Sequence, residues 1–321
     1  MRSATHMSSS IRASKDSYPL ITVITLSYRS KYLFETVRSV LTQSYPNIQY
    51  IISDDATEGF DAEGLRHMIK AENRGNIQQL QIFVNESNQG TVANFNRALR
   101  EAKGTYIFPL AADDAYVAED SLEKWTEAFI SGRDSIMCAC CENYDEDMAV
   151  FRGRWPRPDQ MRLLQTRSCK RIYRYMERQK ILPGCTMART RDSLKTLGYY
   201  DERYRLLEDY PFMMRTLRQG IPIGFWPESA VRHRSGGVSD PEQMHPQLKE
   251  DMERFYNEEV FPFTNNPGRL KRYFTRQVER QRKRNSFEDR WTTASPLEKM
   301  GLLFTAPKFV LKKCYHRLFQ I

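Results

Sequence analysis

The chain lacks any apolar run that approaches the roughly 20 residues needed to cross a bilayer. Its first stretch, MRSATHMSSSIRASKD, also lacks the apolar segment of a secretory signal. These absences argue against a membrane span and against export, so we expect a cytoplasmic protein. The polar, Ser-rich residues 1–17 are interpreted as a flexible leader without a chemical role.

Cysteine is scarce, and its spacing argues against a zinc-binding domain. Three of the six cysteines lie within residues 138–141, too close together for paired C-x-x-C motifs, and the other three are scattered. We interpret them as reduced thiols, most of them buried. They are Cys138, Cys140, Cys141, Cys169, Cys185 and Cys314.

Apolar residues are sufficient for a folded core, because 40% of the 321 residues are hydrophobic and 12% are aromatic. The net charge of +9 is concentrated in the last fifth, where residues 269–284 hold many Lys and Arg but only Glu279 as an acid. The final segment, APKFVLKKCYHRLFQI, would form an amphipathic basic helix.

This basic tail has two interpretations. Its apolar face could insert at an anionic membrane surface, or it could pack on the rest of the protein with its charges in solvent. We favour membrane contact. Nucleic acid is disfavoured as a partner, because the aromatic residues do not alternate with the basic ones as in a stacking platform.

Short β-rich runs alternate with helical patterns from residue 20 to residue 144, which is typical of βαβ units and a mostly parallel sheet. Helical spacing recurs at residues 33–41 and 95–99, and further helices are predicted near residues 171–179, 192–197 and 208–220. Residues 151–180 are otherwise irregular. The predicted strands are residues 21–26, 48–53, 80–84, 105–110, 135–140 and 221–226, with a loop after the last.

Two acidic pairs directly follow predicted strands. Asp54 and Asp55 follow the second strand, and Asp113 and Asp114 follow the fourth. Ligands of such sheets bind outside the carboxyl ends of the strands, so both pairs would face one crevice. A carboxylate pair can hold Mg²⁺ or Mn²⁺ against a diphosphate, or accept hydrogen bonds from a base or ribose. Each pair alone is also compatible with a solvated turn.

A third pair, Glu208 and Asp209, precedes a predicted helix. Acidic residues are ordinary at helix N-termini, where they complement the helix dipole. A carboxylate beside a sugar acceptor could alternatively remove its hydroxyl proton as a general base. Taken alone, this motif favours the cap.

Four blocks in this order resemble the inverting family 2 glycosyltransferases of GT-A fold, especially bacterial enzymes that build surface polysaccharide. The blocks are VITLSYRSKYLFETVRSVLTQSYPNIQYIISDDAT, NQGTVANFNRALREAKGTYIFPLAADD, LGYYDERYRLLEDYPFMMR and RHRSGGVS. The resemblance implies an α/β GT-A domain over residues 18–245, with a Rossmann-like, mostly parallel sheet flanked by helices. Residues 246–321 would form a basic helical C-terminal region.

The resemblance also implies residue roles. Asp209 matches the catalytic base, and Glu208 would orient the acceptor. Asp114 would be the principal metal ligand, with Asp113 at the ribose or metal. Gly184 falls where such enzymes keep a small residue near the donor sugar. The nucleotide pocket would be formed by Ser27, Tyr28, one of Asp54 and Asp55, Asn88 and Asn94.

Two positions depart from the pattern of the relatives. Ala111 stands where many carry an acid, and Arg234 stands where many carry a metal-binding histidine, with His233 one residue earlier. Either His233 reaches the metal, or Arg234 contacts the diphosphate directly.

The activity implied by the resemblance is sugar transfer, with inversion, from a nucleotide-diphosphate donor, most commonly a UDP-sugar, using Mn²⁺ or Mg²⁺. The acceptor would be a saccharide hydroxyl, linked to a polyprenyl diphosphate, at the cytoplasmic face of the membrane. A nucleotidyltransferase is the first alternative, but it usually carries a Gly-rich loop that LSYRSKY lacks. A non-catalytic membrane or RNA adaptor on the same fold is the second.

Overall fold

The structure, a computed structural model, describes residues 18–237 and 245–276. The chain divides into two compact units, Met1–Pro262 and Phe263–Ile321. All elements named below belong to the first unit, and the second contributes a helix over residues 267–276. No helix among the described residues combines the length and apolarity of a membrane span. The predicted leader and most of the basic tail, including the amphipathic segment, lie outside these residues.

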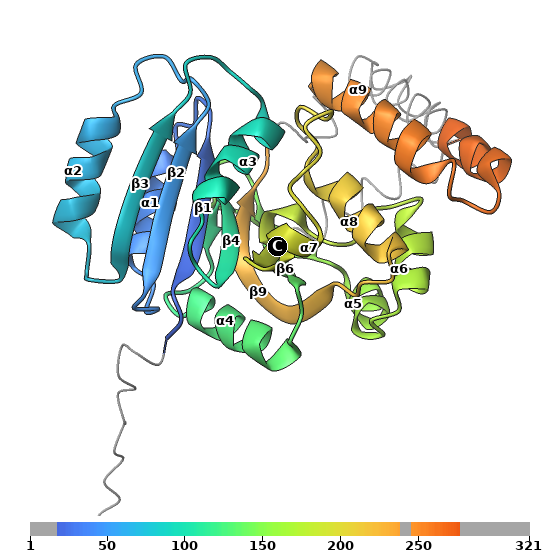
Figure 1. Cartoon of the computed structure of the whole chain (residues 1–321), viewed down its shortest axis with the longest axis horizontal. Coiled ribbons are helices and arrows are strands. Elements are labelled where there is room, and N and C mark those ends of the chain that lie inside the picture. The colour runs from blue at the N-terminus through green and yellow to red at the C-terminus, as the bar shows by residue number, and fades with distance from the viewer. Residues whose placement is uncertain (1–17, 238–244, 277–321) are drawn as a thin grey trace, which may run out of the picture. The chain divides into compact units, whose positions relative to one another are not determined.

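A nine-stranded sheet forms the centre of the first unit, with the order β3-β2-β1-β4-β8-β6-β9-β5 and β7 paired to β6 (Figure 1). Strands β3, β2, β1 and β4 are mutually parallel, and β6 and β9 are also parallel, whereas β8, β5 and β7 pair in the antiparallel sense. The strands are β1 (Ile21–Ser27), β2 (Ile48–Asp54), β3 (Ile77–Val84), β4 (Tyr106–Ala111), β5 (Ala115–Tyr116), β6 (Ile136–Tyr144), β7 (Phe151–Trp155), β8 (Ala188–Thr190) and β9 (Gly224–Arg234).

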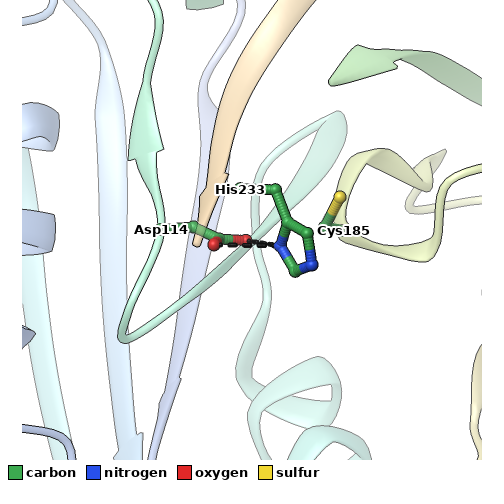
Figure 2. A group of neighbouring side chains, drawn as sticks. All are labelled: Asp114, Cys185 and His233. Atoms are coloured by element: carbon green, nitrogen blue, oxygen red, sulfur yellow. Dashed lines mark hydrogen bonds and ion pairs between the residues drawn. The ribbon is translucent and has the colours of Figure 1, made fainter. Parts of the chain in front are cut away.

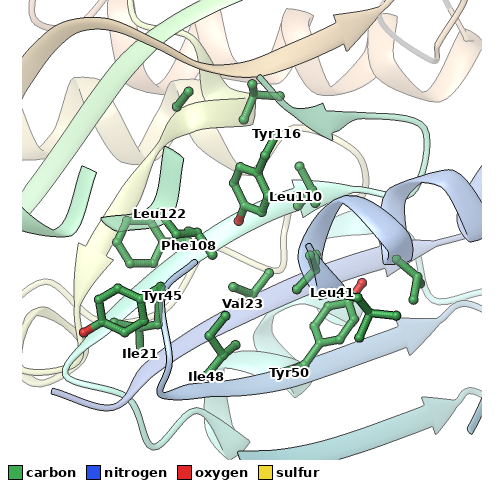
Figure 3. Close-up of a cluster of buried hydrophobic side chains, with 14 of the residues drawn as sticks. Ile21, Val23, Leu41, Tyr45, Ile48, Tyr50, Phe108, Leu110, Tyr116 and Leu122 are labelled. Carbon is green, nitrogen blue, oxygen red and sulfur yellow. The ribbon is translucent and has the colours of Figure 1, made fainter. Parts of the chain in front are cut away.

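Helices cover both faces of the parallel half. The core joins β1, β2 and β4 to side chains of three helices on one face, whereas α3 packs against β1 and β2 without joining that cluster. Phe108 on β4 lies among the buried apolar side chains of this cluster (Figure 3). Its ring is buried completely, and the ring centres of Phe108 and Trp125 are 4.9 Å apart. The helices of this half are α1 (Leu33–Leu41), α2 (Ala62–Glu72), α3 (Thr91–Glu101) and α4 (Ser121–Gly132).

The second half of the unit carries shorter elements that complete the site. They are α5 (Pro158–Gln165), α6 (Cys169–Met176), η2 (Gly184–Thr186), α7 (Ser193–Thr196), α8 (Asp209–Arg218), α9 (Pro246–Phe255) and a π-helical turn, η3 (Tyr256–Val260). Residues 151–180, predicted to be largely irregular, thus contain β7, α5 and α6. Their apolar residues are widely spaced among charged ones, so the hydrophobic pattern is weak.

The strands predicted at residues 21–26, 48–53, 80–84 and 105–110 are confirmed as β1 to β4, with ends within three residues. The strand predicted at residues 135–140 is confirmed as β6, which continues four residues further to Tyr144, and the α/β class is confirmed. Another prediction in the second half is wrong. The strand expected at residues 221–226 begins at Gly224 and continues through Arg234, so residues 231–234, the first part of the expected loop over residues 231–240, are strand. Register shifts in its pairing with β6 interrupt the alternation that would have indicated a long strand.

Candidate functional site

Asp54 and Asp55, at the carboxyl end of β2, are held by local hydrogen bonds. Asp54 accepts from the backbone and the hydroxyl of Thr57, at 2.7 and 2.8 Å. Asp55 accepts from the backbone N–H groups of Gln89 and Gly90, both at 2.8 Å, and thereby fixes the start of α3. Both carboxylates are buried, so these hydrogen bonds within the protein fix their positions.

The other residues of the predicted nucleotide pocket differ in accessibility. Ser27 is buried at the end of β1, while the Tyr28 side chain is 45% exposed. The Asn94 amide is buried and bonds both the side chain and the backbone carbonyl of Ser53, at 2.6 and 2.9 Å. Asn88 accepts from Arg205 at 2.6 Å. Tyr28 therefore offers the most accessible surface of this group, and Asn94 supports β2 from α3.

Asp114 lies at the point where β4 ends and β5 begins, and its side chain is buried completely. One carboxylate oxygen accepts the backbone N–H of Arg234 at 3.0 Å, and His233 Nδ1 lies 3.1 Å from both oxygens. The negative charge of Asp114 raises the pKa of His233 to about 10, although partial burial of the imidazole acts in the opposite direction. Burial, together with the charge of Asp114, raises the pKa of Asp113 to about 6.

Pairing between β5 and β9 explains this meeting of residues that are 119 positions apart. Ala115 lies opposite Arg232 in the antiparallel register, so the next step along both strands brings Asp114 towards His233. His233, not Arg234, thus faces the carboxylate that the sequence identified as the principal metal ligand.

Arg234 points to a different set of groups. Its guanidinium donates to the backbone oxygens of Asp113 and Glu146 and to the Glu35 carboxylate, at 2.9, 2.5 and 2.7 Å. It also stacks 3.5 Å from the centre of the Tyr32 ring. These contacts connect the segments around Asp114, so Arg234 stabilises the structure beside the site.

Cys185 joins Asp114 and His233, and the sequence analysis did not identify it. One potential ligand atom from each of the three residues lies within 4.8 Å of the others. Figure 2 shows the carboxylate and the thiol on different sides of the imidazole ring. Carboxylate, imidazole and thiol are all ligands of divalent cations, so the cluster fits such an ion. A hydrogen bond with Cys141, reinforced by burial, raises the pKa of the Cys185 thiol well above its usual range.

Asp209 begins α8 and is buried, with its carboxylate in an ion pair with Lys180. Burial is the largest single influence and disfavours the charged form of Lys180, but the charge of Asp209, its hydrogen bond with Lys180 and the charge of Glu208 together raise the lysine pKa. Gly184 lies directly against this carboxylate, since a Cβ built at that position would overlap Asp209 Oδ2. Lys180 was not singled out in the sequence because an isolated lysine before an apolar stretch carries no recognisable pattern.

Glu208 precedes Asp209 and has the more perturbed carboxyl group. Burial, followed by the negative charge of Asp209, raises the pKa of Glu208 to about 8. Glu208 therefore keeps its proton to a higher pH than an ordinary carboxyl group does, and strongly shifted carboxyl groups are common at sites of proton transfer.

Comparison with known proteins supports one family. The profile of glycosyl transferase family 2 matches residues 22–198, more than half of the chain. The putative teichuronic acid biosynthesis glycosyltransferase TuaG of Bacillus subtilis is 37% identical over 110 residues, which cover 34% of this chain and 41% of TuaG. A glycosyltransferase of Methanocaldococcus jannaschii, MJ1057, is 26% identical over 219 residues, covering 67% of this chain and 71% of that protein.

Solved structures support the same fold. The structure of S. aureus TarS 1-349 in complex with UDP aligns with a TM-score of 0.51 and 16% identity, covering 77% of this chain and 73% of that one. The structure of the same TarS segment in complex with UDP-GlcNAc aligns with a TM-score of 0.50. The sheet order, the flanking helices and the matched profile lead to one conclusion: the chain belongs to glycosyl transferase family 2 and has the GT-A fold.

Proposed function

We propose that this protein transfers a sugar from a nucleotide-diphosphate donor, a UDP-sugar, to a hydroxyl group of a saccharide acceptor with inversion. The observation that carries the proposal is the placement of two consecutive residues. Gly184 lies against Asp209, and Cys185 lies beside Asp114 and His233. The candidate base and the candidate cation cluster therefore border the same short turn, as a direct displacement requires.

The donor side is assigned to the ends of β1, β2 and β4. Asp114 and His233 would hold a divalent cation, Mn²⁺ or Mg²⁺ in the expectation from the sequence, and Asp113 lies beside them. Such an ion neutralises the diphosphate and stabilises it as a leaving group. The exposed Tyr28 ring offers a stacking surface for the base, next to Ser27, Asp54 and Asp55. The TarS complexes with UDP and UDP-GlcNAc support this donor class.

The acceptor side is assigned to the start of α8. Asp209 accepts the acceptor hydroxyl proton as that oxygen bonds to the anomeric carbon and the bond to the diphosphate breaks. One displacement inverts the anomeric centre and forms no covalent glycosyl-enzyme. Glu208 orients the acceptor, and Lys180 balances the charge of Asp209 before the proton arrives.

Polysaccharide synthesis is the proposed setting, because TuaG is a putative teichuronic acid enzyme and chondroitin synthase of Escherichia coli is 27% identical over 202 residues. The acceptor is linked to a polyprenyl diphosphate, and the basic tail brings the enzyme to the cytoplasmic face of the membrane. Deletion of residues 307–321 is expected to reduce sedimentation with anionic liposomes, and unchanged sedimentation would exclude this role.

Calorimetric titration with UDP, with and without Mn²⁺, tests the proposal against an adaptor that binds no donor. Cation-dependent UDP binding supports the transferase, and the absence of binding under both conditions favours the adaptor. A panel of nucleotide sugars then identifies the donor by its slow hydrolysis. Release of pyrophosphate from a sugar phosphate and a nucleoside triphosphate would instead indicate a nucleotidyltransferase.

Two isosteric variants separate the assigned roles. Asp209→Asn should retain UDP binding but lower transfer by about 100-fold or more, because general-base catalysis contributes about 10²–10⁴-fold. Asp114→Asn should weaken cation-dependent UDP binding. Normal turnover by Asp209→Asn would show that the base has been assigned to the wrong residue.

A further inference from the structure

The Asp114, His233 and Cys185 cluster contains one carboxylate, one imidazole and one thiol. Among residues 18–237 and 245–276 it is the one group of three or more acidic, His or Cys side chains close enough to share a metal ion. Its members come from separate parts of the fold: the β4–β5 turn, the end of β9, and η2. The sequence had suggested Asp114, Asp113 and His233 as the metal site, whereas the structure groups Asp114 and His233 with the sulfur atom of Cys185.

The chemistry of these ligand atoms distinguishes between divalent cations. Mg²⁺ prefers an octahedral shell of oxygen atoms and seldom accepts sulfur. Zn²⁺ binds carboxylate, imidazole and thiolate readily, and its catalytic sites commonly have three protein ligands and a fourth position open to substrate. In the general order of affinity for such ligands, Mn²⁺ is the weakest-binding of these transition metals, and Co²⁺ binds more tightly than Mn²⁺.

We propose that Cys185 is a metal ligand and that it makes this site select Zn²⁺ or a similar sulfur-binding cation over Mg²⁺. The inference rests on the proposed function, because the fourth position would receive a diphosphate oxygen of the donor. It refines the expectation of Mn²⁺ or Mg²⁺ by assigning cation selectivity to one side chain.

Cys185 is presented by a well-anchored turn. The hydroxyl of its neighbour Thr186 donates to the Ala139 carbonyl at 2.8 Å and accepts from the Ala139 N–H at 3.1 Å. Thr186 is buried completely, so η2 is tied to the central strand β6. The Cys185 side chain itself is partly exposed, which allows a cation to reach it from solvent.

The two other ligands are also held in place. Asp114 is kept in position by the Arg234 backbone N–H, and the contact with Asp114 orients the His233 ring. Such supporting contacts pre-organise metal ligands and tune their affinity. Binding would convert the Cys185 thiol to a thiolate and leave one imidazole nitrogen free to coordinate, with the displaced protons passing to the buffer.

Titration of the purified full-length protein with Co²⁺ tests the assignment without any sugar substrate. Thiolate coordination should produce a sulfur-to-cobalt charge-transfer band in the near ultraviolet, and Zn²⁺ should abolish it at stoichiometric concentration. The band should persist in excess Mg²⁺. Cys185→Ser should lose the band and bind Zn²⁺ about 10-fold more weakly or worse, on the scale seen when groups supporting a metal site are changed.

Cys169→Ser is the matched control, because Cys169 is also partly exposed but lies on α6 outside the cluster. It should retain the full band, while circular dichroism verifies that both variants are folded. Cys185→Asp provides a second test, since replacing sulfur with oxygen should move the preference towards Mn²⁺ and Mg²⁺. A cobalt spectrum that is identical in wild type and Cys185→Ser would overturn the proposal, as would displacement of Co²⁺ by equimolar Mg²⁺.

The test of the Cys185 metal site can fail independently of the test of the proposed transferase activity. A cobalt–thiolate band in a protein that hydrolyses no nucleotide sugar would support the metal site and count against the transferase. Donor hydrolysis with the same cation preference in wild type and Cys185→Ser would support the transferase and overturn the role of Cys185.

Discussion

Gly184 shows how one missing side chain determines the position of the candidate base. Asp209 Oδ2 occupies the space that a Cβ at residue 184 would need, and the same carboxylate pairs with Lys180. A close approach of this kind is available only to glycine, because any other residue would force the carboxylate away. Gly184 therefore allows the candidate base to occupy its position beside Lys180.

Gly184→Ala should displace Asp209 from Lys180 and lower transfer by about 100-fold, the lower end of the range for general-base catalysis. Overpacking should also reduce the free energy of unfolding by about 1–3 kcal/mol. Steady-state kinetics and urea denaturation measure the two effects. Gly268→Ala is the control, since its added Cβ would meet no atom closer than 3.6 Å. Wild-type turnover by Gly184→Ala would mean that this close approach is unimportant for catalysis.

At the scale of single residues, the sequence predicted the acidic side chains of the site but not the side chains that contact them. Asp113, Asp114 and Asp209 follow apolar strands or precede a helix, positions that can be recognised locally. Cys185 and Lys180 have no such local pattern, and their contacts with Asp114 and Asp209 arise only when distant segments fold together. The choice between His233 and Arg234 likewise depended on the register between β5 and β9.

At the scale of elements, α9 supports the segment that carries the candidate base. Asp251 on α9 is 3% exposed and accepts the backbone N–H groups of Arg205 and Leu206, at 2.9 and 2.6 Å. These residues come just before Glu208 and Asp209. The helix thus fixes the approach to α8 through one buried carboxylate.

Asp251→Ala should cost about 1–3 kcal/mol of the free energy of unfolding, because it leaves two backbone donors without their charged acceptor. Transfer should fall as well, since the segment before Asp209 loosens. Asp251→Asn keeps an acceptor oxygen, so it should lose less stability in urea denaturation and less transfer activity in steady-state kinetics than Asp251→Ala. Glu250→Ala removes an exposed carboxylate from the same helix and should behave like wild type. Equal stability of Asp251→Ala and Glu250→Ala would refute this supporting role.

The elements that could be predicted are those with continuous apolar runs. Strands β1 and β2 are buried along nearly their whole length, as expected for the centre of a parallel sheet. Strand β9 ends in Arg232, His233 and Arg234, whose charges suggested a loop. Such polar strand ends are needed at a site that handles charge, so the pattern failed where the chemistry is concentrated.

At the scale of the whole molecule, Glu208 links the free energy of unfolding to pH. The pKa of Glu208 is raised to about 8 in the folded protein, above its ordinary value of 4.5, because the group is buried beside Asp209. The folded chain therefore holds this proton more tightly than the unfolded chain does. The resulting contribution to stability is complete below pH 4.5 and is lost as the pH rises to about 8.

Glu208→Gln should therefore flatten the decline of the free energy of unfolding between pH 4.5 and 8, because glutamine stays neutral throughout this window. Urea denaturation at closely spaced pH values measures the decline, and the difference between variant and wild type isolates this group from other titrations. Glu63→Gln, at a side chain that is 74% exposed on α2, controls for the change in net charge. If wild type and Glu208→Gln gave parallel curves, Glu208 would have to be ionised in the folded protein, and its proton could not help to orient an acceptor.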